Sequence, residues 1–104
     1  MLWWLFLSLN NFFNATFRGP GFVPLDGCRR TQKDLVHHCR KCDRCVLRMD
    51  HHCPWINTCV GHENQASFVK FLFYTIVGAF HCLFVLGPSI YRALFFTCTL
   101  KFWK

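Results

Sequence analysis

The apolar residues of this 104-residue chain gather in two stretches on either side of a polar middle. The first stretch is residues 1–17, MLWWLFLSLNNFFNATF, and the second extends from about Phe68 to Leu100. No residue from Phe71 to Tyr91 carries a formal charge, and a helix of this length spans about 32 Å, enough for a hydrocarbon core of about 30 Å. The pattern predicts a transmembrane helix over residues 68–91, followed by a short polar and aromatic tail over residues 92–104.

The opening stretch is shorter and more polar than the second. As a helix, residues 1–17 would reach only about 26 Å, and Asn10, Asn11 and Asn14 dilute the last third. A signal peptide is the alternative, but the charged start and the small-residue cleavage site of such a peptide are missing. We expect residues 1–17 to be the C-terminal part of a membrane helix whose beginning lies outside this chain.

The basic residues indicate how the polar middle faces the membrane. Nine of the 12 Lys and Arg residues lie between Arg18 and Lys70, before the uncharged run, and only three follow Tyr91. The positive-inside rule therefore places residues 18–67 in the cytosol. The net charge of +7 is also compatible with nucleic-acid binding. However, the basic residues are interleaved with Cys and His, and no recognition helix of zinc-finger spacing is present, so we expect no nucleic-acid partner.

The polar middle holds six of the eight Cys and five of the six His residues. Because the cytosol is reducing, this cysteine content favours metal binding over disulfides. Tetrahedral zinc takes Cys and His ligands, and a two-residue gap between two Cys lets a tight turn direct both sulfurs at one ion. Burial of these Cys as small hydrophobic residues is the alternative, but so polar a segment cannot form a core without a metal. The soft ligands in the densest part are His38, Cys39, Cys42, Cys45, His51, His52, Cys53 and Cys59.

One run of four residues, Asp50-His51-His52-Cys53, is more than a zinc site requires. A reactive Cys needs a lowered pKa or a neighbouring base, because the thiolate is the nucleophile. A nearby His can take the thiol proton, and an Asp can hold the imidazole in the correct tautomer. The run therefore suggests a nucleophilic Cys53, although the spacing alone leaves open that Cys53 is another zinc ligand.

The motifs of the polar middle resemble those of the DHHC protein palmitoyltransferases. They are Cys-x-x-Cys-x-x-Cys at 39–45, Asp-His-His-Cys-Pro-Trp at 50–55, and Asn-x-Cys-Val-Gly-x-x-Asn at 57–64. The resemblance extends from Cys28 to Phe68. This family places its cysteine-rich domain in the cytosol between the second and third membrane helices, which agrees with the apolar stretches on either side.

The resemblance implies a two-step acyl transfer. Cys53 would attack the thioester of a long-chain acyl-CoA, and the acyl-enzyme would then pass the acyl group to a Cys of a cytosol-facing protein. His51 would be the general base and Asp50 its orienting partner. His52 would face the other way and bind zinc.

The resemblance also implies two interleaved zinc sites. The ligands of the second site would be Cys39, Cys42, His52 and Cys59. Those of the first site would be Cys28, His38, Cys45 and a fourth Cys at position 25, where this chain has Leu25. A closed structural zinc site has four ligands. Three alternatives follow. His37, Asp26 or water supplies the fourth ligand, or the site is loose or empty. In the last, a segment has been lost between Pro24 and Cys28.

The sequence thus predicts an α-helical membrane protein with about two transmembrane helices. Between them we expect a small zinc-stapled, cysteine-rich cytosolic domain, residues 18–67, with little regular structure beyond short β-hairpins. The expected function is protein S-acyl transfer from acyl-CoA at the endoplasmic reticulum or Golgi membrane, with lipid around the helices. The family has at least four membrane helices, so the alternative is a truncated, catalytically impaired zinc-finger relative that binds partners, including other DHHC proteins.

Overall fold

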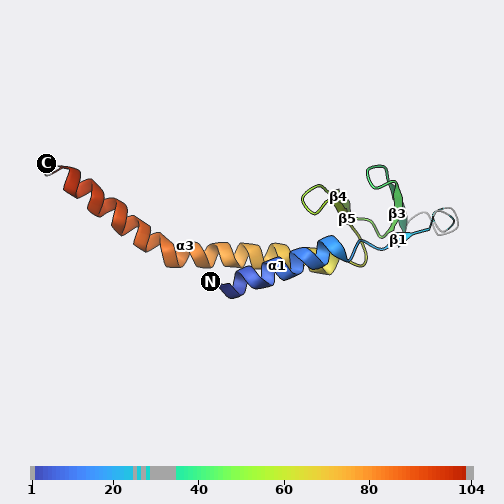
Figure 1. Ribbon diagram of the computed structural model, residues 1–104, viewed down its shortest axis with the longest axis horizontal. Helices are drawn as coiled ribbons and strands as arrows, with labels where there is room; N and C mark the ends of the chain where they lie inside the picture. Colours follow the sequence, from blue (N-terminus) through green and yellow to red (C-terminus); the bar gives the residue numbers. More distant parts are fainter. Residues whose placement is uncertain (1, 25, 27, 29–34, 103–104) are drawn as a thin grey trace.

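The computed structural model describes residues 2–24, 26, 28 and 35–102. The molecule is elongated, with dimensions of 77 × 24 × 20 Å, and its strands gather at one end beside the helices (Figure 1). Its elements are α1 (Leu2–Phe17), β1 (Phe22–Val23), β2 (Val36–Cys39), β3 (Arg44–Leu47), β4 (His51–Cys53), β5 (Thr58–Val60) and α3 (Gln65–Phe102).

The two helices pack side by side and run in opposite directions (Figure 1). Their contact is largely aromatic: the ring centroids of Phe12 and Phe71 lie 5.3 Å apart. A hydrogen bond of 2.6 Å between the Ser8 and Thr75 hydroxyl oxygens adds a polar link. Because α1 covers only the first part of α3, the later part of α3 extends beyond it.

Of the described helices, α3 alone is long and apolar enough to span a membrane, judged by length and composition. The helix has 38 residues, or about 57 Å, and contains Pro88. Proline lacks the N–H that would bond to the carbonyl of Phe84, so it favours a bend, and Figure 1 shows α3 changing direction beyond α1. A second membrane segment at residues 1–17 stays a prediction. Residues 92–102, which we set apart as a tail, continue the same helix.

The strands form two small antiparallel sheets, which confirms the expected short hairpins. One has the order β1-β3-β2, and the other is the β4-β5 hairpin. His38 of β2 lies opposite Cys45 of β3, and His52 of β4 lies opposite Cys59 of β5. Each hairpin thus brings a His and a Cys together across its strands.

A small apolar cluster joins the β4-β5 hairpin to the helices. It consists of buried Cys53, Ile56 and Val60, with Phe12 of α1 and Phe68 of α3 packed against it. Phe68 belongs to the first turns of α3 and Phe12 to the last turns of α1. The hairpin therefore rests on the ends of both helices that lie nearest the sheets.

The side chain of Asn64, which is fully buried, ties the same region together. The backbone N–H of Gly61 donates to Asn64 Oδ1 at 2.9 Å. Asn64 Nδ2 in turn donates to the carbonyl oxygens of Ala15 and Cys59, each at 2.9 Å. These bonds satisfy a buried amide and connect α1, β5 and the start of α3.

Gly61 lies where two backbone segments and a side chain meet. A Cβ atom at this position would lie 2.6 Å from the Pro20 carbonyl oxygen and 2.7 Å from Val46 Cγ1. Both distances are shorter than van der Waals contact, so only glycine fits without movement of its neighbours.

We expect Gly61→Ala to lower the free energy of unfolding by about 1–3 kcal/mol, because the added methyl forces the backbone around Pro20 apart. Thermal unfolding of the purified chain in detergent measures this effect. Gly87→Ala is the matched control, since a Cβ there meets nothing within 4 Å. Equal stability of the two variants would contradict the close packing at Gly61.

Candidate metal centres and catalytic residues

Four soft ligands from both hairpins converge on one point. The Nδ1 atom of His52 lies 3.6 Å from the sulfur of Cys39, 3.3 Å from that of Cys42 and 3.6 Å from that of Cys59. The sulfurs of Cys42 and Cys59 are 3.6 Å apart. In a tetrahedral zinc site the corresponding ligand separations are about 3.5–3.8 Å. These four residues, predicted as the second zinc site, fit a zinc ion.

Local structure explains how the four ligands meet. Cys39 ends β2, and the tight turn to β3 carries Cys42 back beside it. Asp43 completes this turn with φ = 50°, a left-handed conformation that short polar residues tolerate. His52 and Cys59 form a cross-strand pair in the other hairpin. A metal here would join two hairpins that belong to different sheets.

The two buried thiols of this set, Cys39 and Cys59, differ in pKa. Burial acts to raise the pKa of Cys39, but the backbone N–H groups of Cys42 and Lys41 and the Cys59 thiol lower it overall. Burial raises the pKa of Cys59 strongly, and Cys39 and Cys42 raise it further. Without a cation, neighbouring thiolates repel one another and Cys59 keeps its proton. A divalent cation at this site would favour the thiolate form of Cys39, Cys42 and Cys59.

The first predicted site gathers three ligands, Cys28, His38 and Cys45. His38 Nδ1 lies 3.5 Å from the Cys45 sulfur, and His38 Nε2 lies 3.7 Å from a carboxylate oxygen of Asp43. Cys28 and Cys45 are joined by a disulfide. The expectation that these two cysteines bind metal stays a prediction, because their sulfurs and a His38 ring nitrogen lie close enough together to hold an ion once the disulfide is reduced.

Among the described residues, the first site has three possible ligands and no fourth. His37 and Asp26, the two side chains expected to replace it, are absent from the group. For His37 the reason is strand geometry: neighbouring residues of β2 point to opposite faces, so His37 points away from the face of His38. Leu25 itself lies outside the described residues.

The same alternation separates the side chains of His51, His52 and Cys53 on β4. His52 points to the four-ligand set, so its neighbours on β4, His51 and Cys53, point to the opposite face. The metal ligand and the candidate catalytic residues are thus adjacent in sequence and divided by the strand. Among the described groups of possible metal ligands, neither contains Cys53.

The candidate catalytic residues stand at the junction of hairpin and helices. His51 Nδ1 lies 2.7 Å from Asp50 Oδ2, and both side chains are about half exposed. Cys53 is buried in the cluster with Ile56 and Val60. No hydrogen bond links His51 directly to Cys53 within the described part of the chain. The ring of Phe68 lies 5.6 Å from that of His51, edge to face, and Phe68 also packs on the Cys53 cluster.

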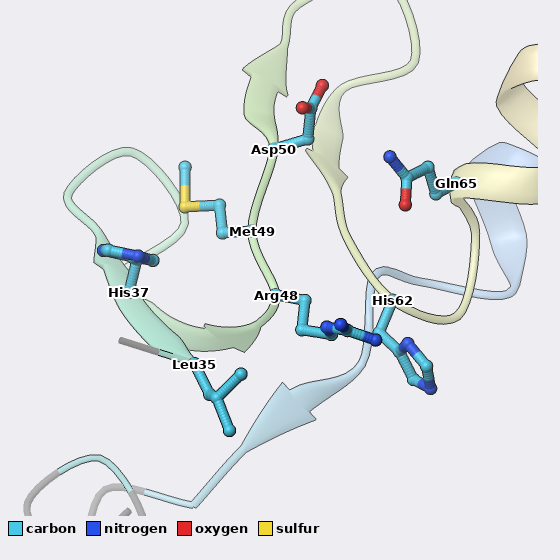
Figure 2. A pocket seen from close by; sticks show the side chains of 7 residues that line it. All are labelled: Leu35, His37, Arg48, Met49, Asp50, His62 and Gln65. Carbon is cyan, nitrogen blue, oxygen red and sulfur yellow. The ribbon is translucent and has the colours of Figure 1, made fainter. Parts of the chain in front are cut away.

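Two features of this site were missed in the sequence. The sequence pattern does not predict the contact of Phe68 with His51; the one hint is the place of Phe68 in the first turns of α3, directly after the motif. The second is a pocket of about 510 Å³ beside Asp50. Figure 2 shows His37 and Met49 on one side of it, Gln65 on the other, and the Arg48 and His62 side chains below Asp50 in this view. His62 had no predicted role.

Comparison with known proteins agrees with this geometry. The family model described as DHHC palmitoyltransferase matches residues 25–103. Palmitoyltransferase PFA3 from Kluyveromyces lactis is 40% identical over 98 residues, covering 81% of this chain and 30% of that protein. Palmitoyltransferase ZDHHC2 from Rattus norvegicus is 46% identical over 65 residues, covering 62% and 17%. Palmitoyltransferase ZDHHC15 from Homo sapiens is 38% identical over 90 residues, covering 86% and 24%.

The chain spans less than a third of the length of these curated relatives. The shared part nevertheless includes both hairpins, the four-ligand set and the Asp50–Cys53 run, and the family model covers most of the chain. This chain therefore belongs to the DHHC palmitoyltransferase family.

Proposed function

We propose that this chain carries the acyl-transfer centre of a protein S-palmitoyltransferase. It would move a long-chain acyl group from acyl-CoA to protein cysteines through an acyl-enzyme at Cys53. The observation that carries the proposal is the alternation along β4. It sets Cys53 and His51 on one face, with His51 hydrogen-bonded to Asp50, and leaves His52 on the metal-binding face.

The hydrogen bond between Asp50 and His51 suits a general base. When His51 Nδ1–H donates to the carboxylate, the lone pair of the imidazole is on Nε2, which can accept a proton. In the first step His51 takes the Cys53 proton, the thiolate attacks the thioester carbonyl, and the CoA thiolate leaves with that proton. In the second step a substrate Cys gives its proton to His51 and attacks the acyl-enzyme, and the proton returns to Cys53.

The surroundings of Cys53 suit an amphipathic substrate. On one side Phe12 and Phe68 lead from Cys53 towards the paired helices, an apolar path for the acyl chain. On the other side the pocket below Asp50 holds Arg48, His37 and His62, whose N–H groups can bind the phosphates of CoA. A thioester at Cys53 would thus have its acyl chain towards the helices and its nucleotide towards solvent.

Zinc would serve structure rather than chemistry in this centre. Cys39, Cys42, His52 and Cys59 supply four protein ligands, which leave no open position for substrate or water. Their contribution is to hold β4 against the β2-β3 hairpin, so that His51 and Cys53 keep their orientation. Zinc at Cys28, His38 and Cys45 would be a weaker, three-ligand site.

We further propose that α1 and α3 lie in the membrane of the endoplasmic reticulum or Golgi. The polar domain would then face the cytosol, as the basic residues of the middle segment favour. Cys53 would sit at the boundary, where acyl chains and protein cysteines both have access. The joined Asp50–His51 pair favours this enzyme over a non-catalytic scaffold that binds other DHHC proteins.

Acyl labelling tests the nucleophile. The purified chain in detergent, incubated with palmitoyl-CoA, is expected to gain a hydroxylamine-sensitive acyl label that Cys53→Ser abolishes. Cys98→Ser is the matched control, because that exposed Cys on α3 lies far along the chain from the site. Full labelling of Cys53→Ser would show that another Cys is the nucleophile.

The role of His51 has a separate test. His51→Ala is expected to slow acyl-enzyme formation by about 10²–10⁴-fold, the range typical of a lost general base. Zinc content should stay unchanged, because His51 points away from the four-ligand set. Loss of zinc together with activity would instead mean that His51 is a ligand.

Metal analysis tests the four-ligand set. Cys42→Ser is expected to lower the zinc content, because the three remaining ligands hold the ion less tightly than a closed set of four. Elemental analysis of the reduced, purified variant beside Cys98→Ser measures this loss. Unchanged zinc in Cys42→Ser would contradict the assignment.

A further inference from the structure

The two ligand sets differ in one respect that the motifs do not reveal. In the four-ligand set the sulfurs of Cys42 and Cys59 remain separate, 3.6 Å apart, and the other three ligand contacts have similar lengths. In the three-ligand set the two sulfurs, Cys28 and Cys45, are bonded to each other. The set that lacks a ligand is thus the one whose cysteines pair.

Exposure also differs between the two sets. The four-ligand set has buried Cys39 and Cys59 and half-buried Cys42 and His52, whereas the three-ligand set has buried Cys45, half-buried Cys28 and exposed His38. A small oxidant can therefore reach the Cys28 sulfur, while Cys45, which is 1% exposed, lies directly beneath it. This is the usual arrangement of an accessible sulfur with a resolving partner.

Zinc and the disulfide exclude each other at this site. Zinc binds thiolates, and a sulfur in a disulfide carries no negative charge and is a poor ligand. Once Cys28 and Cys45 pair, only His38 remains of the three ligands, too few to hold the ion. The disulfide state and the zinc state are therefore alternatives of one set of residues.

We propose that Cys28 and Cys45 form a peroxide-sensitive pair whose oxidation expels zinc from the first site and leaves the four-ligand site loaded. Hydrogen peroxide oxidises the Cys28 thiolate to a sulfenic acid with release of hydroxide. The Cys45 thiolate then displaces a second hydroxide to form the S–S bond. Two thiolates thus give two electrons to one peroxide O–O bond. A dithiol reductant reverses the change by exchange and is itself oxidised to a disulfide.

The change from zinc to disulfide would affect the β1-β3-β2 sheet. Cys45 lies in β3, the central strand, and faces His38 of β2 and Val23 of β1. Either state ties Cys28 to this strand, so the fold persists through the switch, but the oxidised state releases His38. The proposal goes beyond acyl transfer and holds whether or not Cys53 is the nucleophile.

The test uses the full chain with Cys53→Ser, so that the candidate nucleophile does not react. The reduced, zinc-loaded chain in detergent is treated with dilute hydrogen peroxide, and zinc release is followed with a chromogenic chelator. Peptide mapping under non-reducing conditions identifies the linked cysteines. We expect a Cys28–Cys45 link to form as zinc falls from about two ions per chain to about one, and a dithiol to restore the second.

Leu25→His provides the decisive comparison. It adds a nitrogen ligand at the Cys-x-x-Cys spacing without adding a thiol. A fourth ligand should slow formation of the Cys28–Cys45 link, because zinc-bound thiolates are less available to oxidant. Cys98→Ser, an unrelated thiol, should leave the rate unchanged.

Three outcomes would overturn the proposal. In the first, Cys39, Cys42 or Cys59 is oxidised before the Cys28–Cys45 link forms. In the second, the link forms without loss of zinc, as in a chain that holds one ion from the start. In the third, Leu25→His reacts as fast as the parent. None of them bears on acyl transfer, which the Cys53→Ser labelling experiment decides separately.

Discussion

The convergence of Cys39, Cys42, His52 and Cys59 on one point is the constraint from which the polar domain takes its shape. The two sheets are too small to be stable alone, since each has only two or three short strands. Their apolar core is correspondingly slight, with Val46, Ile56 and Val60 as its largest buried aliphatic side chains. A metal held by ligands from both hairpins would provide the missing free energy, as in other small metal-stabilised domains.

This constraint also positions the candidate catalytic residues. Because successive side chains of a strand point to opposite faces, His51 and Cys53 must lie on the face opposite to that of His52. The buried cluster around Cys53 then docks that face on Phe12 and Phe68, at the ends of both helices. The same four-residue run therefore couples the cysteine-rich domain to the helices. A change in the four-ligand set would alter the position of Cys53 through β4, although Cys53 does not belong to that set.

The first ligand set shows how much one residue matters in such a domain. The family pattern has a Cys where this chain has Leu25, and the remaining ligands, Cys28, His38 and Cys45, make an open rather than a closed set. The four-ligand set holds its sulfurs apart, whereas the pair of Cys28 and Cys45 bonds. Because the β4-β5 hairpin contributes His52 and Cys59 to the four-ligand set, the orientation of the candidate catalytic residues depends less on the first set than on the second.

The order and type of residues determined much of this protein on their own. The apolar stretch of α3 was visible as an uncharged run, the Cys and His spacing indicated metal binding, and the resemblance to a known family implied which residues form each ligand set. Specific motifs also indicated the family. Other features depend on residues far apart in sequence that meet only in the folded chain. Examples are the contact of Phe68 with His51, the bonds from Asn64 to Ala15 and Cys59, and the pairing of Cys28 with Cys45. Spacing predicts which residues share a strand face or a turn, because that geometry is local. It does not predict how helices dock on hairpins, or whether two sulfurs approach closely enough to bond, because those distances are set by packing of the whole chain.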